Sequence, residues 1–377
     1  MTAPPVPTQI KSDLRLQITD VLTSVFQERA TKAATYGETV EHHWALAEQS
    51  VLGGKLVRPL LLMQTYDALR KHSLEREGDY ATALSIASAV ELLHCSFLMH
   101  DDVIDGDLTR RGRPNLIGTL LAEFEANPEN QAAPSAPPGK YGASRGLHWA
   151  RTGGILIGDL MLASAHQAFA RAPLPRNTHL RLLDLLEHTI TESIAGELLD
   201  VGLSNAIITP DIATVLAMST YKTATYTFEF PLRAAAILAA ADVALERTLA
   251  VAGRHLGLAY QLQDDLLSTF GDPNQHGKDP FSDLREGKQT ALISRARQTT
   301  EWERIEELFG KPDLSMQEGA RLREMLVTCG SQGFVQNLVD DQIAKFHGLL
   351  VHTDSEVPAD VQRVLLDLAQ QLEGRKS

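Results

Sequence analysis

The chain has 377 residues, of which 35 are Lys or Arg and 48 are Asp or Glu, giving a net charge of −13 at pH 7. This balance argues against a general nucleic-acid-binding protein, and an anionic substrate would need metal ions or a local basic cluster to offset the field. Two cysteines, Cys95 and Cys329, indicate no disulfide framework. The sequence shows no N-terminal signal region and no uncharged run long enough to cross a bilayer, which predicts a soluble, cytoplasmic protein without a membrane span.

The chain has a helical pattern after a short tail. Residues 1–11 include three prolines before any periodic pattern and predict a flexible N-terminal tail. From residue 12 onward, apolar residues recur at spacings of three and four, and alternating strand patterns are scarce. The predicted helical segments are 14–26, 56–70, 80–105, 153–171, 180–203, 214–241, 245–270, 290–309, 317–329 and 361–372. We therefore expect an all-α fold with one large helical domain over residues 12–377.

The segment 127–146 interrupts this pattern. It contains four prolines, three glycines and few side chains that could pack or do chemistry. A structureless loop of this length is uncommon in a compact domain, where it is either a mobile flap or a tolerated insertion. The scarcity of ionisable residues favours an insertion.

Two acidic clusters each end a long apolar helical run. The first holds Asp101, Asp102 and Asp105, and the second holds Asp264 and Asp265. Residues i and i+4 share a helix face, and like charges at that spacing destabilise a bare helix by roughly 0.2–0.5 kcal/mol per pair. Carboxylate oxygens suit Mg²⁺, which keeps several waters and shares its coordination shell with phosphate oxygens. Two such clusters facing each other would hold a diphosphate through Mg²⁺ ions.

A basic segment opens one of the early helices. Gly53 and Gly54 precede Lys55 and Arg58, so backbone N–H groups and two cations could meet one phosphate at a helix N-terminus. The simpler interpretation is a glycine turn before a solvated basic helix start. The acidic clusters in the same chain favour phosphate binding.

More basic residues lie close to the first acidic cluster. Arg110 and Arg111 follow it directly, and arginine forks bind phosphate bidentately, although they could also balance surface charge. His94 lies seven residues before Asp101 on nearly the same helix face. A lone histidine on an apolar helix is most often a core residue, so both interpretations of His94 stay open.

Two lysines accompany the second half of the chain. Lys222, followed by Thr223, lies in an apolar helical segment, where it could simply extend its ammonium group to the surface. Lys278 lies in a charged loop after the second cluster, which could be an ordinary loop or a lid that closes over a phosphate.

Taken together, these motifs resemble those of the trans-isoprenyl diphosphate synthases, or polyprenyl synthetases. The resemblance runs from about Gly53 to Lys288. The matching motifs are GGKxxRP at 53–59, DDxxD at 101–105 with RRGxP at 110–114, Lys-Thr at 222–223, QxxDDxxD followed by GD at 261–272, and Gly-Lys at 277–278. Each motif alone is modest support, whereas all five in the family's order are strong support.

The resemblance implies a fold of the isoprenoid synthase type, a single large helical bundle around a deep apolar cavity, and a homodimer. It implies several Mg²⁺ ions per active site, which hold the allylic diphosphate and are bound by Asp101, Asp102, Asp105, Asp264 and Asp265. The residues that it places against the allylic diphosphate are Arg110, Lys222 and Lys278, with Thr223 and Gln261 beside them. The residues that it places around the diphosphate of isopentenyl diphosphate are Lys55, Arg58, His94 and Arg111.

The reaction implied by the resemblance is ionisation, condensation and elimination. The allylic carbon–oxygen bond breaks while bound Mg²⁺ offsets the charge on the departing diphosphate. The double bond of isopentenyl diphosphate attacks the allylic cation, and the released diphosphate takes the proton. Apolar helix walls exclude water, which would quench the cation.

Product length should depend on the depth of the apolar tunnel beneath Asp101. Phe97 lies one turn before Asp101 and would point down this tunnel, with the small Ser96 beside it. One bulky and one small residue, together with the resemblance, favour geranylgeranyl diphosphate (C20), with a farnesyl or longer-chain product as the alternative. The simpler interpretation is that Phe97 packs in the core and another helix sets the floor.

The sequence departs from the family pattern at three places. Ser268 replaces the last aspartate of the second motif, Leu56 stands where a basic residue is common, and the 127–146 loop is long. A hydroxyl is a weaker metal ligand than a carboxylate, but the resemblance gives the first aspartate of that motif the most weight.

Two other functions fit part of the pattern. A class I terpene cyclase also uses an aspartate-rich motif, but it needs no basic set for a second diphosphate. A non-catalytic partner subunit would tend to lose metal-binding aspartates, and this chain keeps the first trio.

Overall fold

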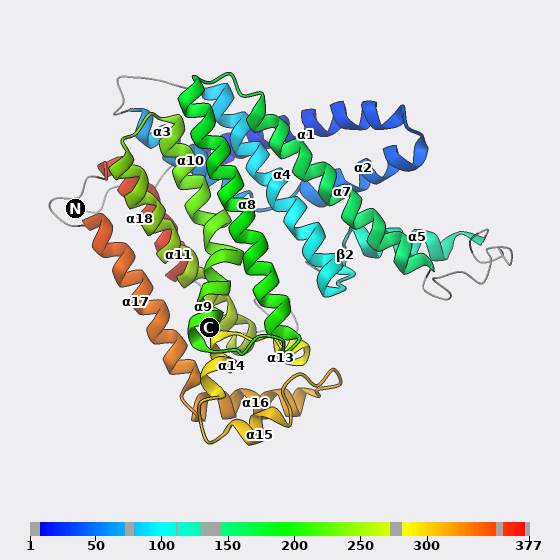
Figure 1. The fold of residues 1–377 in the computed structure, drawn as a ribbon, viewed down its shortest axis with the longest axis vertical. Coiled ribbons are helices and arrows are strands. Elements are labelled where there is room, and N and C mark those ends of the chain that lie inside the picture. The colour runs from blue at the N-terminus through cyan, green and yellow to red at the C-terminus, as the bar shows by residue number, and fades with distance from the viewer. Residues whose placement is uncertain are drawn as a thin grey trace. The chain divides into compact units, whose positions relative to one another are not determined.

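The computed structural model describes residues 8–71, 79–110, 112–128, 130, 145–271, 281–351 and 357–373. These residues form helices and one two-stranded antiparallel sheet (Figure 1), so the all-α prediction is confirmed. The internal contacts divide the chain into two compact units. The N-terminal unit consists of residues 7–60 and 79–174, and the C-terminal unit is built from residues 61–78 and 175–377. One domain over residues 12–377 stays a prediction.

The N-terminal unit is a set of long helices with one hairpin. Its elements are α1 (Thr8–Ala34), α2 (Glu38–Val51), the start of α3 (Val57–Arg70), α4 (Tyr80–Asp105), β1 (Thr109–Arg110), β2 (Arg113–Pro114), α5 (Leu116–Ala126) and α7 (Arg145–Ala170). In its core, Phe26 of α1 packs edge-on against Trp44 of α2, with ring centroids 5.8 Å apart. α1 begins inside the segment that we expected to be tail. Of the expected 127–146 loop, residues 129 and 131–144 lie outside the described residues.

α4 carries the first aspartate motif and is the central apolar helix of this unit. Asp79 caps its start, accepting a 2.6 Å hydrogen bond from the Thr82 backbone N–H, and Gly106 ends it in the left-handed conformation with φ 76°. Its 18-residue window of mean hydropathy 1.5 is apolar enough to cross a membrane, but 78% of that window is buried inside the protein. Core packing therefore accounts for the apolar character of α4.

The C-terminal unit contains the remaining helices. They are the rest of α3, α8 (Arg176–Ser204), α9 (Ile212–Ser219), η2 (Thr220–Glu229), α10 (Phe230–Leu238), α11 (Val243–Phe270), α13 (Ser282–Glu286), α14 (Ala291–Ala296), α15 (Trp302–Glu306), α16 (Met316–Thr328), α17 (Ser331–Val351) and α18 (Ala359–Glu373). One core cluster includes Leu262 and Leu266 of α11 and Val335 and Val339 of α17. A second one surrounds Leu322 and Leu326 of α16. The contacts of Leu262 and Leu266 anchor the end of α11 that carries the second aspartate motif against α17.

Two predicted helices have different forms in the structure. The segment 214–241 is not one α-helix, because the π-helix η2 lies between α9 and α10. The segment 290–309 forms two short helices, α14 and α15, with turns between them. Both errors have the same reason, because apolar spacings of three and four do not report where the backbone changes its hydrogen-bond pattern.

Two glycines allow neighbouring helices to approach the wide π-helix. A Cβ added at Gly196 of α8 would lie 2.3 Å from the backbone nitrogen of Lys222, and one at Gly257 of α11 would lie 2.5 Å from Ala224 Cα. Any larger residue at either position would force the helices apart. The close packing on both sides fixes where η2 presents Lys222 and Thr223.

Candidate active site

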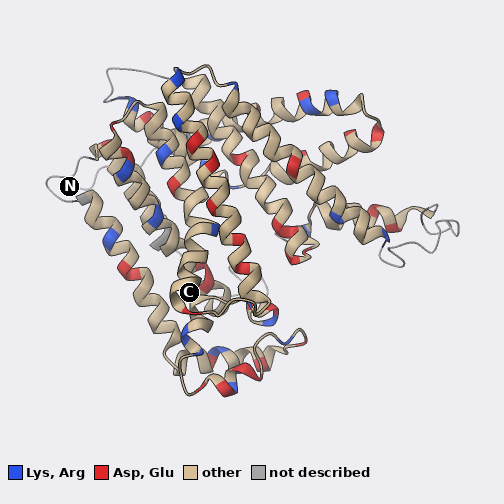
Figure 2. Cartoon of the chain, viewed as in Figure 1, with Lys and Arg blue, Asp and Glu red and all other residues tan. Residues whose placement is uncertain are grey.

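The carboxylates of the first aspartate motif point in two directions. Asp105 is exposed and Asp101 is half-buried, whereas Asp102 is only 5% exposed. Figure 2 shows acidic residues gathered at this C-terminal end of α4. Asp101 and Asp105 share one helix face, as the i, i+4 spacing predicted, and Asp102 is turned toward the interior.

A short hairpin brings Arg110 back onto this motif. Gly106 ends α4, and β1 and β2 reverse the chain. The Arg110 guanidinium donates from Nε to Asp102 Oδ1 at 3.0 Å and from Nη2 to Asp101 Oδ2 at 3.2 Å, with a shorter Nη2 bond to Asp102. This fork clamps the two adjacent aspartates. Arg111, the next residue in the sequence, lies outside the described residues.

Burial and pairing act against each other in this clamp. Burial raises the pKa of Asp102, and the hydrogen bond and charge of Arg110 oppose that rise. Burial also acts to lower the pKa of Arg110, but its hydrogen bonds and charge interactions with Asp102 and Asp101 outweigh this effect and raise it. A buried ion pair of this kind is costly to break, because the remaining charge is left uncompensated.

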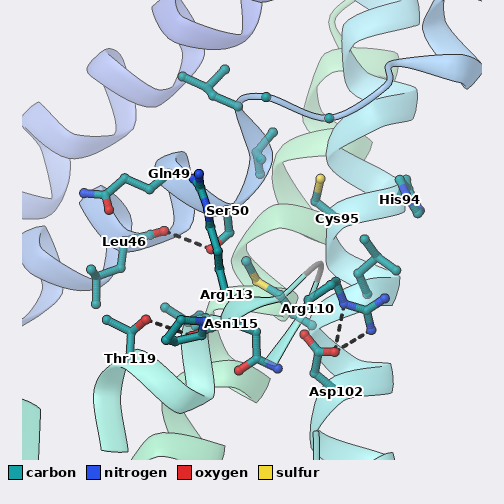
Figure 3. Close-up of a pocket in the computed structure, with 18 of the residues that line it drawn as sticks. Leu46, Gln49, Ser50, His94, Cys95, Asp102, Arg110, Arg113, Asn115 and Thr119 are labelled. Atoms are coloured by element: carbon teal, nitrogen blue, oxygen red, sulfur yellow. Dashed lines mark hydrogen bonds and ion pairs between the residues drawn. The ribbon is translucent and has the colours of Figure 1, made fainter. Parts of the chain in front are cut away.

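A cavity of about 610 Å³ lies within the N-terminal unit beside this clamp. Figure 3 shows Asp102 and Arg110 joined at its wall, with Gln49 and Ser50 of α2 across from them. Its α4 wall is formed by Glu91, His94, Cys95, Leu98, Met99 and Asp102. The glycine pair 53–54, Arg113 and Asn115 also line it. The cavity thus brings together parts of three predicted motifs, namely the glycine segment, His94 and the first aspartate cluster.

The glycine segment forms a held loop at the edge of this cavity. Gly53 has φ 95°, and Leu56 adopts φ 52°, a conformation that costs a non-glycine residue energy. Arg15 of α1 donates to the carbonyl oxygens of Gly54 at 2.9 Å and Lys55 at 2.7 Å. Lys55 is exposed, and α3 begins just after the loop. Among the described residues that line the cavity, neither Lys55 nor Arg58 is included.

The second aspartate motif lies on α11 in the C-terminal unit. Asp265 is 8% exposed, while Asp264 is half-buried. Thr223 of η2 donates to Gln261 Oε1, and Gln261 Nε2 donates to Asp265 Oδ1, both at 2.8 Å. Burial raises the pKa of Asp265 well above its ordinary value, and Gln261 opposes the rise. A chain of two hydrogen bonds thus joins three predicted site residues, Thr223, Gln261 and Asp265.

Lys222 is held by acidic residues that we did not predict. Its Nζ lies 2.9 Å from Glu197 Oε2 and 2.6 Å from Asp200 Oδ2, both on α8. The signal was present in the sequence, because Glu197 and Asp200 are three residues apart in the otherwise apolar stretch 194–203. Lys278, the other predicted lysine of this half, lies outside the described residues.

The sequence matches one family over most of its length. Residues 41–326 match the family described as Polyprenyl synthetase. The chain belongs to this family. Among the relatives of this polyprenyl synthetase, a short chain isoprenyl diphosphate synthase of Methanocaldococcus jannaschii is 29% identical over 73% of the chain and 72% of that protein. A geranylgeranyl diphosphate synthase of Methanosarcina mazei is 27% identical over 76% of each. Other relatives carry the names farnesyl and geranylfarnesyl diphosphate synthase.

A solved structure shares the fold of this polyprenyl synthetase. It is a geranylgeranyl pyrophosphate synthase from Corynebacterium glutamicum complexed with isoprenyl diphosphate and magnesium. The TM-score is 0.83 at 28% identity, over 95% of this chain and 98% of that one. The predicted isoprenoid synthase fold is thereby confirmed, and the chain is a prenyltransferase of this family.

The donor groups of this polyprenyl synthetase fit magnesium by their chemistry. Asp101 and Asp105 offer carboxylate oxygens from one helix face, which is the ligand type that Mg²⁺ prefers. Within the described ranges, no three His, Cys, Asp or Glu side chains already surround one point that a metal ion could occupy. This arrangement suits a metal whose remaining ligands are waters and substrate phosphate oxygens.

Sequence reasoning missed several residues of the site. Glu91 and Cys95 are 4% and 6% exposed and line the cavity. They were missed because their importance depends on which face of α4 the hairpin and α2 cover. Asp283 of α13 contacts Ser268 of the second motif from a different helix.

Proposed function

We propose that this polyprenyl synthetase condenses an allylic diphosphate with isopentenyl diphosphate in a Mg²⁺-dependent reaction, with geranylgeranyl diphosphate as the main product. The observation that carries this proposal is the cavity in which the glycine segment, His94 and the Asp102–Arg110 clamp meet. A polar site of this kind suits a diphosphate, and family membership supplies the reaction class.

The proposed roles of the residues follow from their positions in the structure. Asp101, Asp105 and Asp264 would hold magnesium, which when bound supplies the positive charge that offsets the departing diphosphate. Arg110, whose guanidinium lies against Asp101 and Asp102, would donate to diphosphate oxygens when substrate binds. Leu98 and Met99 supply apolar wall to the cavity, which limits the access of water to a cationic intermediate. The released diphosphate would accept the proton, so no protein base is required.

The second substrate would bind at the glycine loop. His94 lies in the cavity wall at 9% exposure, and Gly53 and Gly54 line the same cavity, where their backbone N–H groups would meet an anion. Lys55 and Arg58 extend the same segment and would add positive charge for the diphosphate of isopentenyl diphosphate.

A C20 product is supported by relatives and by two side chains. Several relatives are named geranylgeranyl diphosphate synthase. Ser96 is fully buried and Phe97 is half-buried, one turn before Asp101. Neither lines the described 610 Å³ cavity, so a growing prenyl chain would pass along a different face of α4.

The proposed function is tested by product analysis of the purified chain with Mg²⁺, isopentenyl diphosphate and each allylic diphosphate in turn. We expect C20 diphosphate as the main product by mass spectrometry. A volatile hydrocarbon formed without isopentenyl diphosphate would identify a terpene cyclase instead. Complete inactivity with both substrates would favour a non-catalytic partner subunit.

The role of Phe97 in setting the product length is tested by a separate variant. Phe97→Ala removes a bulky side chain beneath Asp101, and we expect products longer than C20. The matched control is Leu98→Ala, which removes a side chain of comparable size on the cavity face and should leave the product length at C20. An unchanged product distribution in Phe97→Ala would contradict the role of Phe97.

A further inference from the structure

The second aspartate motif of this chain lacks its last aspartate, and the structure brings another carboxylate to that place. Ser268 stands at the position, half-buried on α11, one turn after Asp264. Its Oγ donates a 2.5 Å hydrogen bond to Asp283 Oδ2. Asp283 belongs to α13, 15 residues further along the chain, so it enters the motif from a separate element.

The carboxylates at this end of α11 differ in accessibility. Asp265 is 8% exposed, and one of its oxygens accepts a hydrogen bond from Gln261. Asp264 is half-buried, and the Asp283 side chain is 20% exposed. Asp264 and Asp283 are therefore better placed than Asp265 to meet an ion from solvent.

The local charge leaves room for a cation. Through its hydrogen bond to Ser268, Asp283 adds a third negative charge to those of Asp264 and Asp265 at this end of α11. Lys288 opposes them, but its Nζ lies 3.5 Å from Asp283 Oδ1 and closer, at 3.3 Å, to Glu286 Oε2. The Lys288 side chain is 44% exposed, so its charge is partly screened by solvent. The carboxylates of Asp264, Asp265 and Asp283 thus share a partly buried site. The one lysine beside them, Lys288, is partly exposed and also pairs with Glu286.

We propose that Asp283 replaces the missing aspartate, so that Asp264 and Asp283 are the metal-binding carboxylates of the second motif and Ser268 positions Asp283. This inference rests on the proposed function, in which magnesium binds at this motif. A serine hydroxyl brings no charge to a magnesium site, but it can donate a hydrogen bond that fixes the direction of a carboxylate ligand. The bond from Ser268 engages Oδ2, so a cation would bind Oδ1, which Lys288 Nζ approaches to 3.5 Å.

The test measures metal binding directly, with Mn²⁺ as a paramagnetic substitute for Mg²⁺. The purified full-length chain is titrated with Mn²⁺ in the presence of inorganic diphosphate, and free Mn²⁺ is followed by electron paramagnetic resonance. We expect Asp283→Asn to weaken Mn²⁺ binding about tenfold or more, the range seen when a metal site loses an orienting or ligating group. We expect the double variant Ser268→Asp/Asp283→Asn to recover most of that loss, because the carboxylate returns on α11 itself.

The matched control is Glu286→Gln on the same short helix. It removes one negative charge and one partner of Lys288 but no proposed ligand, so Mn²⁺ binding should stay within about twofold of the parent. Melting curves by circular dichroism establish that each variant is folded. Parent-like Mn²⁺ binding by Asp283→Asn would overturn the inference, and so would a double variant that binds as weakly as Asp283→Asn.

The failure of this inference can be told apart from failure of the proposed function. If the parent chain makes no prenyl product with both substrates, the proposed function falls while the Mn²⁺ titration still reports on Asp283. If the parent makes product and Asp283→Asn binds Mn²⁺ normally, only the inference about Asp283 falls.

Discussion

At the scale of single residues, the clamp between Arg110 and the first aspartate motif connects stability with chemistry. Arg110 holds Asp102, which is 5% exposed, and also reaches Asp101. The same guanidinium would serve a diphosphate when substrate binds. The adjacent aspartates therefore have different tasks, since Asp102 keeps Arg110 in position while Asp101 shares its helix face with Asp105.

Replacing Arg110 should separate these tasks. In Arg110→Gln the Asp102 carboxylate stays buried without its cation, and we expect the free energy of unfolding to fall by about 2–3 kcal/mol. Arg110→Lys keeps the charge but loses the fork, so its loss should be smaller. Urea denaturation measures both. The control Arg113→Gln lines the same cavity from an exposed position and should change stability by less than about 0.5 kcal/mol. Equal losses in Arg110→Gln and the control would show that the clamp carries no stability.

At the scale of elements, the π-helix η2 is the feature that sets the geometry of the C-terminal unit. It presents Lys222 to α8 and Thr223 to α11 at the same time. An ion-pair network connects η2 with both neighbouring helices. Arg254 of α11 donates to Glu192 of α8 at 2.9 Å and also pairs with Glu229 of η2. π-Helical turns are frequent at functional sites, and here one places two of the predicted site residues.

The close packing around η2 can be tested with one methyl group. In Gly257→Ala the new Cβ would lie 2.5 Å from Ala224 Cα, so η2 must shift, and we expect a loss of about 1–3 kcal/mol in the free energy of unfolding. The same shift should weaken the Thr223–Gln261 bond and raise the KM for the allylic diphosphate.

The matched control for this variant is Gly333→Ala on α17. A Cβ at Gly333 would meet nothing within 4 Å, so the substitution should stabilise the helix by about 0.5–1 kcal/mol. Thermal unfolding followed by circular dichroism compares the two. If Gly257→Ala is as stable as Gly333→Ala, the packing around η2 is looser than the structure indicates.

The elements also show what the sequence could and could not predict. The helices that carry both aspartate motifs were predictable, because apolar periodicity and motif order are written locally along α4 and α11. The π-helix was not predictable, because its residues keep helical spacing while the hydrogen-bond pattern changes. The contact of Ser268 with Asp283, and the inward position of Glu91, depend on how separate elements fold back on each other. Local patterns contain no information on such contacts.

At the scale of the whole molecule, the surface carries apolar side chains whose exposure to water does not stabilise a monomer. On α7, Trp149, Leu156 and Leu160 are 42%, 56% and 41% exposed, and their spacings of seven and four place them on one helix face. An exposed apolar stripe of this kind is typical of an association surface. It is consistent with the homodimer that we propose on the basis of family resemblance.

The α7 stripe gives the dimer proposal a direct test. Size-exclusion chromatography with light scattering should give the parent chain a mass of about twice 41.2 kDa. In Leu156→Glu/Leu160→Glu, a dimer interface would have to bury two unpaired carboxylates, each at a cost of several kcal/mol, so we expect a folded monomer. Val327→Glu introduces a carboxylate at an exposed position of a different helix, α16, and should remain dimeric. A parent chain that elutes as a monomer, or a double variant that stays dimeric, would remove α7 from the interface.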